Sequence, residues 1–233
     1  MTAVLPWLTL FVCVAMTAVR VSSAIRGQNR TMFFLFALLS VDILLSIREP
    51  YLAVDTVLGG FNLANLLLRF LLYGTFLLLG FRTAAAFGSS AGMRAIRGPV
   101  GLAVLAGVTV LTAWIFFSMD TRGSSAGLSG LPQTPALESY AALGRLYPGY
   151  VAACLLPGIW QAVRGSGPAL LRLASGTLFL GFCLLLLSQG FPLVPESAAW
   201  LRPAINYSAA LASALGLGGI WLSKSLARRR AHG

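Results

Sequence analysis

Apolar stretches alternate with short polar connections along the whole chain. Each stretch reaches or approaches the roughly 20 residues that an α-helix needs to cross the hydrocarbon core of a bilayer, which is about 30 Å thick. The pattern therefore predicts an all-α polytopic membrane protein, a seven-transmembrane-helix bundle that forms a single domain over residues 1–233. The predicted spans are 3–24, 31–47, 61–87, 99–119, 139–163, 168–190 and 198–223.

The composition independently argues against a water-soluble protein. Hydrophobic residues make up 58% of the chain and charged residues only 10%, whereas soluble domains carry about 25% charged residues. The connections are too short to form a separate soluble domain. The longest connection, 120–138, is rich in glycine and serine, and we expect a flexible outer loop that is either a plain linker or a lid over an outer cavity.

The basic residues predict the orientation of the bundle. A net charge of +11 would suit a nucleic-acid partner, but the basic residues concentrate in alternate connections. Arginine and lysine mark the cytoplasmic side of membrane proteins, so we expect the N-terminus outside, the C-terminus in the cytoplasm and no nucleic-acid partner. The residues on the predicted cytoplasmic side are Arg20, Arg26, Arg30, Arg82, Arg94, Arg97, Arg164, Arg172, Lys224, Arg228, Arg229 and Arg230.

The last three of these arginines close the chain as a cluster. This cluster fits the topology rule, and it could also hold anionic membrane lipids at about 1 kcal/mol per basic residue. Arginine greatly outnumbers lysine, and alanine, leucine and glycine are abundant, which is typical of GC-rich bacterial coding. We therefore expect the protein in a bacterial inner membrane, in contact with membrane lipids.

No catalytic or metal-binding pattern is found in the sequence. Cys13, Cys154 and Cys183 fall in different spans, and the single histidine, His232, is next to the last residue. No group of histidine, cysteine and carboxylate residues has the spacing of a metal site. We therefore expect no enzymatic activity, cofactor or metal ion.

Two charged residues, Asp42 and Arg69, lie where a membrane should exclude charge. Both are about 9 to 10 Å from the outer ends of their spans, since a helix rises about 1.5 Å per residue. A charge at this depth is costly and marks either function or a buried pair. Because consecutive helices are antiparallel, we expect Asp42 and Arg69 to form an ion pair, which either belongs to a ligand site or fixes two helices.

Further polar residues recur at helical spacing on the third and seventh spans, which turns them toward one face away from lipid. In the fifth span, Pro148 and its polar neighbours make the outer half barely hydrophobic, so we expect that half to be kinked and shielded by other helices. Together these faces predict an outward-facing polar cavity with surplus positive charge, suited to a small anionic or amphipathic ligand. In the alternative interpretation Arg145 and Arg202 extend to the outer headgroups. The candidate ligand-binding residues are Asp42, Asn62, Asn65, Arg69, Tyr73, Arg145, Tyr147, Arg202 and Asn206.

The stretch 55–66, with the sequence DTVLGGFNLANL, resembles the segment before a span in uncharacterised seven-helix integral membrane proteins of actinobacteria. Some of those proteins are labelled transporters. The resemblance implies a bacterial membrane location and importance for Asn62 and Asn65.

Three functions are compatible with this sequence. In the first, the cavity binds or senses a ligand and signals to a cytoplasmic protein partner. In the second, the same cavity transports a small solute, which requires a polar path through the inner half of the membrane. In the third, the protein is a structural or accessory subunit. The inner half holds few polar residues, which favours sensing or an accessory role over transport.

Overall fold

The computed structural model describes residues 4–230 and, within them, every side chain except those of Glu196 and Arg228 to Arg230. The predicted lipid contact of the terminal arginine cluster therefore lies outside the described side chains. The described chain is built from helices and their connections, without a strand. The α-helices are α1 (Val4–Ile25), α2 (Arg30–Ser46), α3 (Arg48–Val57), α4 (Leu63–Ala86), α5 (Ser90–Arg97), α6 (Pro99–Ser118), α7 (Pro135–Arg164), α8 (Ala169–Leu187) and α9 (Leu201–Arg230), and the 3-10 helices are η1 (Ala126–Leu128), η2 (Ser188–Leu193) and η3 (Glu196–Ala198).

The helices α1, α2, α4, α6, α7, α8 and α9 occupy the ranges predicted as spans. Five helices are long and apolar enough to cross a membrane, namely α1, α4, α6, α8 extended by η2, and α9. A sixth span results if α2 and α3 are taken together, although the two helices meet at 92°. α7 is not among them, since polar residues, glycine and proline interrupt its apolar sequence. The structure is thus that of an all-α membrane protein with five or six helices of membrane-crossing length and composition.

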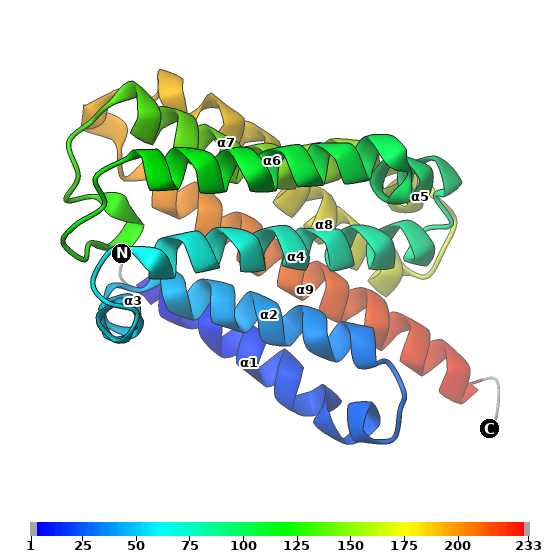
Figure 1. Ribbon diagram of the computed structural model, residues 1–233. Coiled ribbons are helices and arrows are strands. Elements are labelled where there is room, and N and C mark those ends of the chain that lie inside the picture. The colour runs from blue at the N-terminus through cyan, green and yellow to red at the C-terminus, as the bar shows by residue number, and fades with distance from the viewer. Residues whose placement is uncertain (1–3, 231–233) are drawn as a thin grey trace.

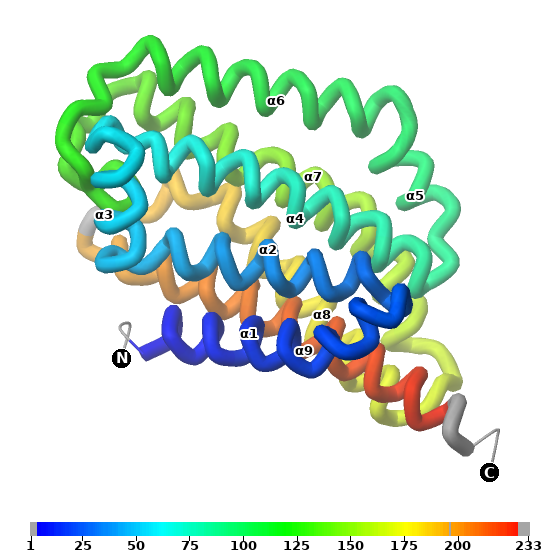
Figure 2. Tube along the Cα trace, turned by 60° about the horizontal axis from the view of Figure 1, so that its bottom comes forward, coloured from blue at the N-terminus to red at the C-terminus, as the bar shows by residue number. Residues whose placement is uncertain are grey.

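Six helices form a closed ring. Each helix packs against the next in the order α1, α2, α4, α7, α8 and α9, and α9 returns to α1 (Figure 2). α6 lies outside the ring against α7 and α4. The buried core between the helices includes Phe36, Tyr73, Leu155 and Phe182. This order turns one face of α2, α4, α7, α8 and α9 toward a common interior.

The two ends of the bundle differ in their connections. α3 and the loop that contains η1 lie at one end, whereas α5 and the turn between α1 and α2 lie at the other (Figure 1). The described chain begins in α1 at the α3 end and finishes in α9 at the α5 end. An odd number of membrane crossings would separate the two ends of the chain in this way.

A buried carboxylate, Asp55, organises the turn between α3 and α4. Its two oxygens accept the backbone N–H groups of Asn62 and Ala64, each at 3.0 Å. Gly59 (φ +103°) and Gly60 (φ +76°) supply the left-handed backbone that brings the chain back to this carboxylate. The negative charge therefore lies at the N-terminus of α4, where it satisfies N–H groups that the helix leaves free and where the helix dipole favours it.

Asn62 joins this turn to the loop after α6. Its side-chain oxygen accepts hydrogen bonds from the Tyr51 hydroxyl at 2.7 Å and the Ser125 N–H at 2.9 Å. Its side-chain nitrogen donates to the carbonyls of Thr121 and Gly123, both at 2.9 Å. The Asn62 side chain thus has all its hydrogen bonds within the protein, and it fixes the loop that leads into η1.

Arg20, one of the arginines predicted on the cytoplasmic side, is buried within the bundle. The side chain is 1% exposed, inside the junction of α1, α2 and α9. Its guanidinium carbon lies 4.5 Å from the centre of the Phe36 ring and 4.7 Å from that of Trp221, and Nη1 donates to the Met16 carbonyl at 2.7 Å. Two aromatic neighbours give this buried arginine cation–π contacts that sequence spacing does not reveal.

We expect Asp55→Ala to lower the free energy of unfolding by about 2–4 kcal/mol. The substitution removes the carboxylate that accepts the N–H groups of Asn62 and Ala64 and the hydroxyl of Ser124, and it leaves these donors without an acceptor. Thermal unfolding in detergent micelles measures the change. The control is Asp120→Ala, which removes an exposed carboxylate from the same end of the bundle. Equal stability of the two variants would contradict the capping role of Asp55.

Candidate functional site

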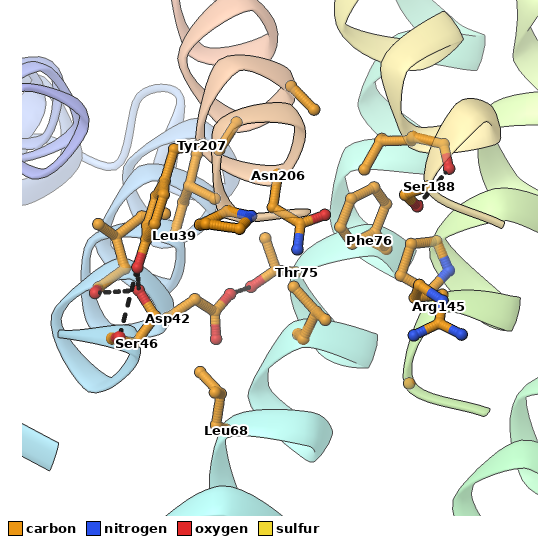
Figure 3. Close-up of a pocket in the computed structure, with 18 of the residues that line it drawn as sticks. Leu39, Asp42, Ser46, Leu68, Thr75, Phe76, Arg145, Ser188, Asn206 and Tyr207 are labelled. Atoms are coloured by element: carbon orange, nitrogen blue, oxygen red, sulfur yellow. Dashed lines mark hydrogen bonds between the residues drawn. The ribbon is translucent and has the colours of Figure 1, made fainter. Parts of the chain in front are cut away.

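A cavity of about 670 Å³ lies inside the ring (Figure 3). Residues of α2, α4, α7, α8 and α9 line it, and Ala126, Gly127 and Ser129 of the η1 loop contribute at the α3 end of the bundle. The loop 120–138 therefore borders the cavity. The polar residues of the lining are Asp42, Ser46, Arg69, Thr75, Ser129, Arg145, Ser188, Arg202, Asn206, Tyr207 and Ser213.

The structure brings five of the predicted ligand-binding residues to this cavity. They come from four helices that are distant in sequence, which is the convergence expected from the polar faces. These residues are Asp42, Arg69, Arg145, Arg202 and Asn206.

Four predicted residues lie outside the cavity and serve packing. Asn65 accepts a hydrogen bond from the Tyr140 hydroxyl at 2.9 Å, and the Tyr73 and Thr112 hydroxyls are 2.9 Å apart. These contacts turn part of the α4 polar face toward α6 and α7 instead of the interior, because helical spacing defines a face but not its neighbour. The residues outside the cavity are Asn62, Asn65, Tyr73 and Tyr147.

The expected ion pair between Asp42 and Arg69 is not formed. Asp42 Oδ2 accepts a hydrogen bond from the Thr75 hydroxyl at 2.7 Å, and among the described residues Oδ1 has no partner. Arg69 turns toward α7 instead, where its guanidinium carbon lies 5.2 Å from the centre of the Tyr140 ring. Asp42 and Arg69 both line the cavity, but the side chain of Arg69 packs against Tyr140 of α7 and not against α2.

Gly144 of α7 provides the space that Arg69 occupies. A Cβ atom added at Gly144 would overlap the Arg69 guanidinium. Both residues line the cavity, so the absence of a side chain at position 144 lets the guanidinium lie against the wall of α7. A larger residue there would push the positive charge away from this wall.

Three arginines, Arg69, Arg145 and Arg202, carry the positive charge of the cavity. The Nε atom of each is buried and has no hydrogen-bond partner among the described residues. The guanidinium carbon of Arg145 lies 5.6 Å from the centre of the Phe191 ring. Arg202 Nη2 donates to the Val194 carbonyl at 3.1 Å. The cavity thus holds surplus positive charge that no acidic residue offsets within ion-pair distance in the described chain.

The other end of the cavity is apolar. Leu35, Leu79 and Leu217 line the cavity farther from the α3 end than the charged residues of the same helices do. The cavity is therefore amphipathic, with three cationic side chains in one part and a hydrocarbon lining in the other. Such a space can enclose an alkyl chain and bind an anionic group at once.

Thr75 and Tyr207 also line the cavity, although neither was predicted, and Ser46 belongs to the polar face expected on the second span. The Ser46 and Tyr207 hydroxyls lie 3.0 Å apart and join α2 to α9, and Thr75 contacts Asp42 (Figure 3). Tyr207 directly follows Asn206 in the sequence, which was its one available signal. Thr75 gave no signal in the sequence, since the hydroxyl of a threonine within a helix commonly donates to a backbone carbonyl of the same helix.

Comparison of the chain with models of known protein families, with curated proteins and with solved structures found no match.

We expect a cysteine at position 206 to react readily with a charged methanethiosulfonate reagent, because the side chain of Asn206 is exposed within the cavity. The measurement is the mass increase of purified Asn206→Cys, in a background without the native cysteines. Ala214→Cys is the matched control on the same helix, since Ala214 is buried and does not line the cavity, and it should react far more slowly. Similar rates at the two positions would contradict an accessible cavity.

Proposed function

We propose that the chain crosses a bacterial inner membrane seven times, with the N-terminus outside. Two of these crossings do not qualify by length and composition alone: α2, which does so only together with α3, and α7. Burial of Tyr140, Gly144 and Tyr147 among neighbouring helices supports the crossing by α7, because these residues are thereby shielded from lipid. The position of Arg94 and Arg97 in α5, at the end opposite α3, supports a cytoplasmic location for that end. The cavity then opens toward the outside.

We further propose that this cavity binds an anionic amphiphile. The observation that carries the proposal is that Arg69, Arg145 and Arg202 line one cavity beside apolar residues, each with an Nε that has no partner among the described side chains. A phosphate or carboxylate could accept charge-assisted hydrogen bonds from these guanidinium groups. An alkyl chain would fill the part of the cavity lined by leucine and phenylalanine.

Sensing agrees better with this cavity than transport. A transporter for a polar solute requires polar groups toward the other side of the membrane, whereas Leu35, Leu79 and Leu217 line the inner part of the cavity. Leu35 directly precedes Phe36, and Leu217 lies one helical turn before Trp221, so both are linked to the rings that enclose Arg20. In this proposal a bound chain shifts that junction, and a cytoplasmic protein partner detects the change.

The test uses dodecyl ethyl phosphate, a single-chain phosphodiester with one negative charge, added to the purified protein in a neutral detergent. We expect it to raise the thermal unfolding temperature, because a ligand that binds only the folded state stabilises that state by about 2.7 kcal/mol at a hundredfold excess over Kd. Arg69→Gln should weaken binding by about tenfold or more, since a hydrogen bond to a charged group is worth about 1.5–3 kcal/mol.

The control removes the same amount of charge outside the cavity. The triple variant Arg48→Gln, Arg94→Gln, Arg122→Gln changes three exposed arginines, and we expect it to bind the phosphodiester as the unmodified protein does. The variant with Gln at 69, 145 and 202 should lose the stabilisation. Equal stabilisation of both triple variants would show that the amphiphile binds elsewhere and would contradict the proposal.

A further inference from the structure

Asp42 is a buried acid with one unused oxygen. Its side chain is 3% exposed, and Oδ2 is occupied by the Thr75 hydroxyl. Oδ1 is buried without a hydrogen-bond partner among the described residues, and the residue lines the cavity. A buried carboxylate oxygen without a donor is costly, so the free oxygen indicates a position where a ligand can supply one.

No cation of the described chain fills this position. Arg69, Arg145 and Arg202 line the same cavity, but none forms an ion pair with Asp42 within the 4.0 Å limit. Asp42 and Arg145 enter the cavity from opposite sides, with Asn206 and Phe76 between them (Figure 3). The cavity therefore presents separate acidic and basic groups to whatever occupies it.

We propose that the ligand is a zwitterionic amphiphile, whose primary ammonium donates a hydrogen bond to Asp42 Oδ1 while its phosphate or carboxylate is held by the arginines. This inference rests on the proposed binding of an anionic amphiphile and adds the ammonium group to it. The alkyl chain occupies the apolar lining around Leu39, Phe76 and Leu217. A lipid with an aminoalkyl phosphate headgroup has this chemistry. Binding it pairs the buried acid and the three arginines at once, which neither a simple anion nor a simple cation can do.

The experiment compares two probes that differ only in the ammonium group. Dodecyl 2-aminoethyl phosphate and dodecyl ethyl phosphate share the chain and the phosphodiester, and only the first carries a cationic donor. We expect the protein to bind the aminoethyl probe at least about tenfold more tightly, as a charge-assisted hydrogen bond predicts. Isothermal titration in a neutral detergent gives both affinities.

Asp42→Asn should abolish this preference while leaving the affinity for the ethyl probe nearly unchanged, which also shows that the variant keeps its cavity. Asp120→Asn is the matched control, since it removes an exposed carboxylate outside the cavity lining, and it should retain the preference. Equal binding of the two probes by the unmodified protein would overturn the zwitterion inference and leave the proposed function intact. Binding of neither probe would overturn both.

Two further probes test the donor and the chain without any variant. Dodecylphosphocholine has a cationic group that cannot donate an N–H hydrogen bond, and we expect it to bind at least about tenfold more weakly than the aminoethyl probe. Ethyl 2-aminoethyl phosphate has the headgroup without the long chain, and we expect it to bind at least about a hundredfold more weakly because it buries little apolar surface. Equal binding of the choline probe would overturn the role of the ammonium donor, and equal binding of the short probe would overturn the assignment to an amphiphile.

Discussion

A charge can be buried among apolar helices only if another group pairs with it or solvates it, and this constraint governs the interior of the bundle. Four ionisable side chains, Asp42, Arg69, Arg145 and Arg202, face one cavity inside the ring, and none forms an ion pair with another. If the arginines served only to hold helices together, direct pairing with the acid would be the simplest solution. Their separation around an open space is the basis of the proposal that the missing partner is a ligand.

In the turn between α3 and α4, by contrast, the buried polar groups are paired within the protein. There Asp55 and Asn62 are buried, but every polar atom of these two side chains has a hydrogen-bond partner within the protein. The network also fixes residues 121–125, which lead into η1 and so position Gly127 and Ser129 at the cavity. One polar cluster therefore builds the end of the bundle, and the other lines the cavity for which we propose a ligand.

The sequence predicted the helical ranges and the convergence of polar faces because apolar length and helical spacing are local properties of the chain. It also identified Asp42, Arg69, Arg145, Arg202 and Asn206, since charged and amide groups within an apolar stretch are conspicuous. It could not predict which neighbour each face meets: Arg69 lies against Tyr140 and Gly144 rather than Asp42, and Asn65 bonds to Tyr140. Arg20 lies between the aromatic side chains of Phe36 and Trp221 because α1 packs between α2 and α9, and no local sequence pattern encodes this order of helices.

We propose that the cavity holds a small amphiphile in the membrane. Native mass spectrometry of the protein, extracted gently from its own membrane, tests this most directly. We predict a retained mass above that of the bare chain in the unmodified protein, its loss in Arg69→Gln, and its persistence in Arg48→Gln, which changes an exposed arginine outside the cavity. Bare chain alone, or retention that is equal in all three proteins, would contradict the account and would make the buried charges a feature of helix packing.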